Sequence, residues 1–200
     1  MLLFEGFDLM DLVGPYEVLL TANRLVARRG EDEPFEVVTL SAGRVPVRAY
    51  GGLEVRPDVD ADDPGHLDVV VVPGTIDVDT ALADTTLVAT VGRLGATAAT
   101  TTSVCTGSFL LAEAGLLVGR SATTHHEDVP ALAGREDVGT AVTGVRWVDD
   151  GEVVTAAGIS SGIAFGLHLV DRFAGRDLAL ACARQIEHSW DPEGRDVVPA

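Results

Sequence analysis

Lysine is missing from this chain, which carries 14 basic side chains, all arginine, against 31 acidic ones. The resulting formal net charge of −17 would repel nucleic acids and acidic membrane surfaces. We therefore expect no nucleic-acid partner and no membrane partner. The acids occur in short groups, such as residues 31–33 and 60–63, which indicates solvated loops rather than an acidic tail.

Cysteine is scarce, and no long run is purely apolar. The two cysteines, Cys105 and Cys182, fit a reducing compartment and argue against a disulfide framework. The first residues show no basic leader followed by an apolar region and a cleavage site. The uncharged stretch 94–112 has about the length of a membrane span but is rich in Thr, Ser and Gly. We expect a cytoplasmic protein without a transmembrane helix.

The apolar pattern predicts one α/β domain over residues 1–200, since 200 residues with 46% apolar content suffice for one sizeable core. Short β-branched runs alternate with segments of helical period, which indicates a mostly parallel sheet with helices on both faces. The expected strands are 35–40, 68–73, 97–104 and 152–155. The expected helices are Pro15–Arg29, Ala81–Leu94, Gly107–Ala114, Gly162–Phe173 and Leu178–Glu187, with Pro15 in a first turn and Gly30 as a stop.

A first strand over residues 2–4 is shorter than the average strand of about five to six residues. From this we expect the natural start to lie a few residues earlier. In sheets of this kind, ligands bind at the carboxyl ends of the strands. That rule selects the loop after Phe4, the turn Pro73–Thr75 and the segment Ser103–Gly107.

Cys105 lies where a small-residue strand runs into an apolar helix, as in a nucleophile elbow with sulfur in place of hydroxyl. Gly107 permits the close turn, and the helix N-terminus would favour the thiolate. The N–H of Thr106, with one from the Pro73–Thr75 turn, could hold developing negative charge. The alternative is a buried, inert cysteine. Cys182 lies on a helix face of core type, and we expect it to be structural.

Three acids, Asp8, Asp11 and Glu17, follow the first strand and can reach the same edge of the sheet as Cys105. A carboxyl group that touches a thiolate must be protonated, since two like charges would repel each other; such an acid can donate a hydrogen bond to sulfur and later handle a proton. Spacing alone does not separate the three. Each could equally be an acid at a helix N-terminus.

His125 follows a short strand at Ser121–Ala122 and could act as a base or an orienting group near the thiol. The run His125–Glu127 also suggests a metal site. Adjacent histidines in a strand point to opposite faces and make a poor pair of ligands, so we expect neither a metal nor a cofactor.

The chain resembles the DJ-1/PfpI (ThiJ) superfamily, and within it the isonitrile hydratase-like branch. The resemblance runs through nearly the whole chain. Its motifs are Leu3-Phe4-Glu5-Gly6-Phe7, Asp11 to Leu19, Val71-Val72-Pro73-Gly74, Ser103 to Ser108, Ala112 to Leu117 and Ala122-Thr123-Thr124-His125. The sequence differs from the family pattern at Thr75, His126 and Ala164, where Gly, Trp and an acid are usual.

The resemblance implies a flavodoxin-like fold and a homodimer. It makes Cys105 the nucleophile, Asp11 the acid that contacts it, and Thr106 the residue after the nucleophile. Gly74 would supply an amide to an anion pocket that Thr75 and His125 also line. The substrate would be a small molecule: thiolate attack on the terminal carbon of an isonitrile would give a thioimidate, which water would release as an N-substituted formamide.

Two other functions stay open. A glyoxalase or deglycase would use His125 in proton transfer, whereas a redox or ligand sensor would use oxidation or ligand binding at Cys105. Glutamine amidotransferase chemistry would require a His-x-Glu pair near the C-terminus, and His188-Ser189-Trp190 does not match it. Relatives fused to helix-turn-helix regulators exist, but residues 191–200 are too few for such a unit, so we expect none here.

Overall fold

The centre of the molecule is a four-stranded sheet in the order β5-β6-β10-β9. The computed structural model describes residues 1–195. Strands β5 (Val69–Val72), β6 (Thr100–Val104) and β10 (Val153–Ala156) are parallel, and β9 (Trp147–Asp150) pairs antiparallel with β10 at the edge. The three buried strands are the apolar runs that the sequence pattern predicts, within a few residues at their ends.

The first residues extend this sheet beyond β5. The N–H of Leu2 donates to the Val71 carbonyl over 2.9 Å, and Leu3 bonds to Leu40 over 2.8 Å. Leu40 belongs to β1 (Leu40–Ser41), which pairs in parallel with β4 (Val59–Asp60). The predicted first strand is therefore confirmed as a short pairing segment between β5 and β1.

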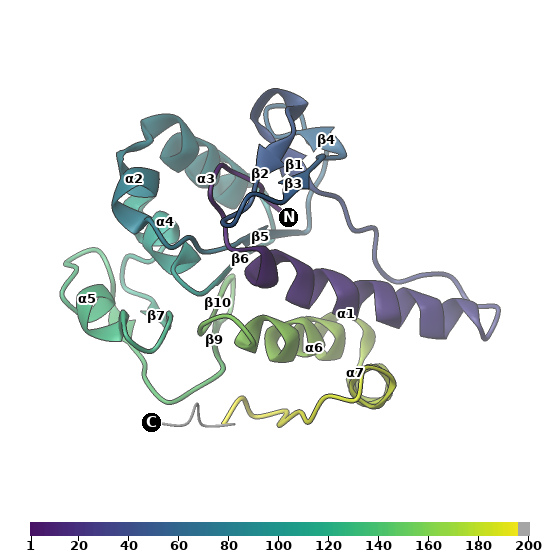
Figure 1. The fold of residues 1–200 in the computed structure, drawn as a ribbon. Coiled ribbons are helices and arrows are strands. Elements are labelled where there is room, and N and C mark those ends of the chain that lie inside the picture. The colour runs from purple at the N-terminus through teal and green to yellow at the C-terminus, as the bar shows by residue number, and fades with distance from the viewer. Residues whose placement is uncertain (196–200) are drawn as a thin grey trace.

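Helices cover both faces of the sheet, as the alternating pattern predicts. Figure 1 shows α1, α6 and α7 gathered on one side of the strands and α2, α3 and α4 on the other. The bounds of the first group are α1 Leu9–Ala27, α6 Ser161–Ala174 and α7 Arg176–Gln185. The bounds of the second group are α2 Val78–Ala83, α3 Thr85–Thr97 and α4 Gly107–Glu113.

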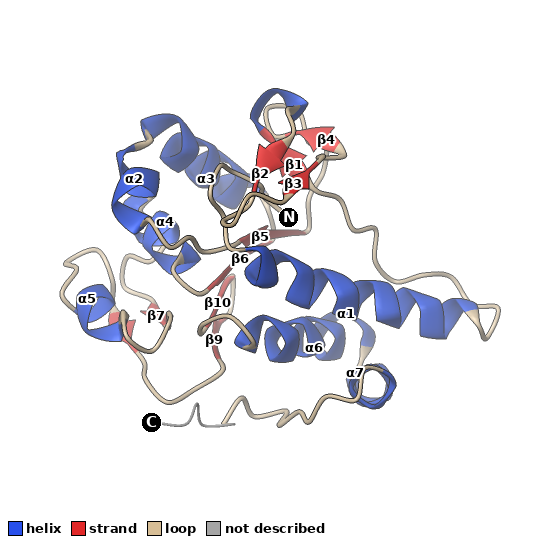
Figure 2. Ribbon diagram, viewed as in Figure 1, coloured by secondary structure: helices blue, strands red, loops and turns tan. Residues whose placement is uncertain are grey.

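Smaller elements lie around this three-layer body. Figure 2 shows β1 to β4 as a cluster at one end of the molecule and β7 beside α5 at another. The remaining bounds are η1 Ala42–Arg44, β2 Val47–Arg48, β3 Glu54–Val55, β7 Ser121–Ala122, α5 Val129–Ala133 and β8 Thr140–Ala141. The short strand at Ser121–Ala122 is the one predicted before His125.

The first helix begins earlier than predicted, at Leu9 rather than at Pro15. Asp8 caps it, since its side chain accepts a hydrogen bond from the Met10 N–H over 3.0 Å. Pro15 lies inside the helix, where it removes one backbone hydrogen bond. Tertiary packing compensates, because α6 approaches so closely that a Cβ on Gly166 would lie 2.9 Å from the Pro15 Cα.

Three further expectations were wrong in detail. The predicted helix 81–94 is two helices, because Asp84 ends α2 and caps α3 by accepting hydrogen bonds from Thr86 and Leu87. Helix α3 continues to Thr97, so the strand predicted from residue 97 begins at Thr100. Of the predicted strand 35–40, only the end pairs, as β1.

The core forms one connected set of buried apolar side chains that joins both helical layers to the sheet. Its largest fully buried members include Phe7, Phe165, Leu2 and Leu40. Within residues 1–195, no helix has the length and apolar character needed to cross a membrane.

Candidate active site

Cys105 forms the turn between β6 and α4, as predicted. Its φ of 56° lies in the left-handed region, which is strained for a residue with a side chain. Gly107 is required here, since a Cβ on it would collide with the Val72 carbonyl and lie 2.7 Å from that of Pro73. The backbone of the elbow is therefore in close contact with the end of β5. The sulfur is nearly enclosed, with 8% of the residue exposed.

Asp11 reaches the same place from the first turn of α1, and it is fully buried. Its Oδ2 accepts a hydrogen bond from the Gly74 N–H over 2.9 Å. Its Oδ1 makes no hydrogen bond of ordinary length. The Cys105 thiol is nevertheless close enough to act on this carboxyl as a hydrogen-bond donor. The Asp11 carboxyl is thus placed to exchange a proton with the sulfur.

Burial, together with the smaller effect of the Asp8 charge, raises the pKa of the Asp11 carboxyl from 3.8 to about 7. Burial also raises the pKa of the Cys105 thiol to about 12, and the Asp11 charge adds to this effect. Hydrogen bonds from the Ile159 and Thr106 amides lower the thiol pKa but do not outweigh burial. The Thr106 amide at the N-terminus of α4 thus favours the thiolate in the expected direction, but burial has the larger effect.

The two groups behave as one acid–thiol pair. Neighbouring groups that would both become anions cannot easily ionise together, so the thiol keeps its proton when Asp11 loses one, and above about pH 7 the pair holds a single proton. A thiolate forms when that proton moves to Asp11. The expectation that an acid in contact with the sulfur must be protonated whenever the sulfur is charged stays a prediction; burial does raise the Asp11 pKa, as expected.

Thr106 fastens the elbow to the Pro73–Thr75 turn. Its hydroxyl accepts from the Thr75 N–H over 2.8 Å and donates to the Thr75 carbonyl over 2.7 Å. Gly74 has no room for a side chain, since a Cβ would lie 2.6 Å from the Thr106 Oγ1 and 2.8 Å from the Asp11 Oδ2. The Gly74 amide, predicted to line an anion pocket, and the neighbouring Thr75 amide are thus already bonded to side chains, and the role of Gly74 and Thr75 toward a substrate stays a prediction.

The loop after β10 supplies a group that the sequence reasoning missed. The Ile159 N–H hydrogen-bonds to the Cys105 sulfur, and Ile159 has a positive φ of 30°. The segment 156–161 contains only Ala, Gly, Ile and Ser, so no side-chain chemistry marks it. The rule that ligands bind at the carboxyl ends of parallel strands would have selected this loop, because β10 lies beside β6.

His125 lies in the neighbouring loop. Thr124 connects this loop to the elbow through a hydrogen bond from its hydroxyl to the Cys105 carbonyl over 3.0 Å. The His125 ring covers Gly158 so closely that any side chain there would collide with it. Its Nδ1 faces the carboxylates of Glu127 and Asp128 at 3.9 and 3.5 Å.

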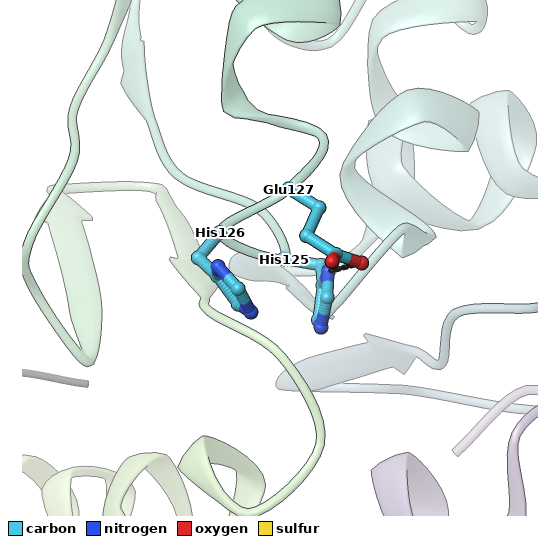
Figure 3. Close-up of side chains that lie close together, drawn as sticks. All are labelled: His125, His126 and Glu127. Atoms are coloured by element: carbon cyan, nitrogen blue, oxygen red, sulfur yellow. Dashed lines mark ion pairs between the residues drawn. The ribbon is translucent and has the colours of Figure 1, made fainter. Parts of the chain in front are cut away.

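The two adjacent histidines do not point to opposite faces, as predicted for a strand. They lie in a turn, where their ring centroids are 4.5 Å apart (Figure 3). The reason given for dismissing a metal at this run is therefore wrong.

The other candidate acids and the second cysteine have other places in the structure. Glu17 is exposed, and Asp8 serves as the cap of α1. Cys182 is fully buried in α7 and, like Cys105, is a free thiol. Of the three acids that spacing could not separate, Asp11 is the one brought to Cys105.

Comparison with known proteins agrees with this architecture. The profile of the DJ-1/PfpI family matches residues 1–172. An isonitrile hydratase from Pseudomonas putida is 34% identical over 194 residues, which make up 96% of this chain and 78% of that protein. The crystal structure of a ThiJ/PfpI family protein from Pseudomonas syringae has a TM-score of 0.81 at 32% identity, covering 96% of this chain and 75% of the other.

A regulator is also similar. The HTH-type transcriptional regulator GbdR of Pseudomonas aeruginosa is 31% identical over 183 residues, or 90% of this chain. The match spans 47% of the regulator. The same kind of domain is therefore found in proteins whose names describe an enzyme and in proteins whose names describe a regulator.

Proposed function

Because this chain belongs to the DJ-1/PfpI family, we propose that it is a cysteine-dependent hydratase that converts a small isonitrile into an N-substituted formamide. One observation carries the proposal: Asp11 is a buried carboxyl with a free oxygen beside a thiol on a strained elbow. The similarity to the hydratase of Pseudomonas putida supports the choice of reaction.

The chemistry uses the single proton of the pair. The sulfur of Cys105 bonds to the terminal carbon of R–N≡C while Asp11 passes the proton to that carbon, which gives the thioimidate R–N=CH–S–Cys105. The oxygen of a water molecule then bonds to the C=N carbon, while the Asp11 carboxylate takes a proton from that water and passes it to the nitrogen. When the C–S bond breaks, the hydroxyl proton returns to Asp11, leaving R–NH–CHO and the starting pair.

The surroundings suit an uncharged substrate. Two exposed isoleucines, Ile76 and Ile159, belong to the loops beside the elbow, with 60% and 40% of their surfaces exposed. Once Asp11 has lost a proton, above about pH 7, the pair carries one negative charge wherever its remaining proton lies, and the chain as a whole is acidic. An apolar, neutral R group meets these conditions better than an anion does.

The test is mass spectrometry of protein incubated with a simple alkyl isonitrile, following formamide and any cysteine adduct together. Wild type should form formamide, and Cys105→Ala should form none. Cys182→Ala is the matched control, because it removes the other buried thiol and should keep turnover. Formamide from Cys105→Ala, or none from wild type, would reject the hydratase; conversion of methylglyoxal instead would favour the glyoxalase alternative.

A ligand or redox sensor is the second candidate, and the similarity to a transcriptional regulator favours it. In that case mild peroxide should oxidise Cys105 selectively while no isonitrile is turned over. Homodimer formation and a cytoplasmic location stay predictions from the sequence.

A further inference from the structure

The turn after β7 gathers three groups that bind metals in proteins. His125, His126 and Glu127 each offer a ligand atom, and all these atoms lie within 4.8 Å of one another. Figure 3 shows the two imidazole rings side by side, with the Glu127 carboxylate over one end of the His125 ring. The cluster is outside the acid–thiol pair, and the reaction proposed above does not use it.

We propose that this turn binds a divalent transition-metal ion, with Zn²⁺ as the best fit. Two imidazoles and one carboxylate are a donor set that zinc uses, whereas Mg²⁺ and Ca²⁺ prefer oxygen alone. Around a tetrahedral zinc ion the ligand atoms are about 3.3 Å apart. The three groups must therefore close by roughly 1.5 Å or less. His126 and Glu127 are exposed and free to rotate, so the closure is within their reach.

The turn is built to hold the first of these ligands still. The His125 ring is packed over Gly158, and its side chain is only 21% exposed. The backbone closes the turn through a hydrogen bond from the Asp128 N–H to the His125 carbonyl over 2.9 Å. The segment before the turn is held to β10, because the Thr123 N–H donates to the Thr155 hydroxyl over 2.8 Å. A fixed ligand reduces the entropy lost when an ion binds.

A carboxylate outside the triad completes the arrangement. The Asp128 Oδ2 lies 3.5 Å from the His125 Nδ1. A carboxylate in this position can orient a ligating imidazole or occupy a further position on the ion. The triad supplies three ligands, so the fourth position of a tetrahedral ion is open to water when Asp128 orients His125 instead of binding the ion.

The location links the ion to the elbow. Thr124, next to His125, is hydrogen-bonded to the Cys105 carbonyl, and Gly158 under the ring precedes Ile159, whose amide bonds to the sulfur. An ion here would lie close to the elbow without using the thiol as a ligand. Metal binding is therefore separable from any reaction of Cys105.

The experiment uses tag-free protein titrated with Co²⁺ under visible absorption, followed by displacement with Zn²⁺. The wild type and Cys105→Ser should each bind one ion per chain. His126→Asn and Glu127→Gln should each weaken binding at least about tenfold. Both residues are exposed, so these variants should fold, which thermal unfolding would verify. His66→Asn is the matched control, because His66 forms an exposed pair with Asp68 at 3.2 Å elsewhere, and its loss should change nothing.

Three outcomes would overturn the proposal. Equal affinity in the wild type, His126→Asn and Glu127→Gln would show that the turn is not the site. Loss of binding in Cys105→Ser would assign the ion to the thiol. Absence of binding by wild-type protein at millimolar Co²⁺ and Zn²⁺ would show that the side chains are simply solvated.

Discussion

The two cysteines share burial and differ in almost everything else. Cys105 is 8% exposed and Cys182 is 0% exposed, and burial raises the pKa of both thiols, to about 12 and about 11. Cys182 lies in the regular helix α7, and the charge of Arg24 lowers its pKa slightly. Cys105 has a left-handed backbone, two amides directed at its sulfur and a carboxyl group beside it.

The difference shows that neither burial nor thiol pKa distinguishes the two cysteines of this protein. What separates the two residues is a backbone conformation that costs energy, together with polar groups that can move a proton. Strain of this kind persists only where the surrounding structure enforces it. Substitutions at the elbow should therefore have effects that differ from those of the same substitutions in a regular helix.

The largest effect is expected for Gly107→Ala. Its new Cβ would collide with backbone carbonyls of Val72 and Pro73, so β5 and the elbow must move apart. We expect a loss of about 3 kcal/mol in unfolding free energy and a fall in isonitrile turnover of at least about a hundredfold. Urea unfolding and steady-state kinetics measure the two effects.

Gly92→Ala is the control for that change. Gly92 lies in α3, where a Cβ would be 3.7 Å from that of Ala114, an ordinary contact. In a regular helix this substitution should stabilise by about 0.5 to 1 kcal/mol. If Gly107→Ala were as harmless as Gly92→Ala, the elbow would not depend on the close contact with β5.

The next effect is the pH dependence that Asp11 contributes. Its pKa is about 7 in the folded protein, against an ordinary value of 3.8 for a solvated aspartate. The folded state therefore binds the proton more tightly, and stability falls as pH rises through the range between these values. In Asp11→Asn this pH-dependent fall in folding stability should be absent. The variant should be more stable than wild type above pH 7, by a few kcal/mol, with little difference at pH 4.

Chemical unfolding of both proteins across pH 4 to 8 measures that difference. Asp77→Asn is a control with a flat profile over this range, because hydrogen bonds from Thr80 lower the Asp77 pKa below 3.8, so its stabilisation is lost only at a pH below about 4. A difference between wild type and Asp11→Asn that stays constant with pH would contradict the raised pKa of Asp11.

The smallest effect compares alanine with glycine at each cysteine. At position 105 glycine should be more stable than alanine by about 1 kcal/mol, because it relieves the left-handed strain. At position 182 glycine should be less stable than alanine by about 1 kcal/mol, as in any helix interior. Thermal unfolding of the four variants gives both differences. The same sign at both positions would show that the elbow is not strained.

The sequence predicted the parts of the fold that depend on continuous apolar runs. Strands β5, β6 and β10 and the elbow at Cys105 follow from local pattern alone. The strand expected over 35–40 failed because its backbone groups bond elsewhere. The Asn23 side chain bonds to both the N–H and the carbonyl of Phe35, and the Asp58 carboxylate accepts from the Thr39 N–H. Hydrogen bonds to residues this distant along the chain leave no periodic pattern in the sequence.

The site was predictable where chemistry lies in side chains and not where it lies in the backbone. Cys105, Asp11 and Thr106 could be named from the sequence, and the structure brings them together. Ile159 could not, because it contributes an amide that every residue possesses. The convergence of His125 and His126 depends on a turn rather than a strand, which the short β7 did not reveal.

The unpaired oxygen of Asp11 has a consequence for selectivity. Passing the proton between sulfur and oxygen moves a negative charge over a short distance without creating or removing one. The bottom of the site therefore keeps the same net charge in both forms, and no counterion must enter or leave a region of low permittivity. Above the pKa of Asp11, a ligand carrying its own negative charge would be repelled in either form, so the pair would favour neutral molecules; below that pKa a second proton would remove the repulsion.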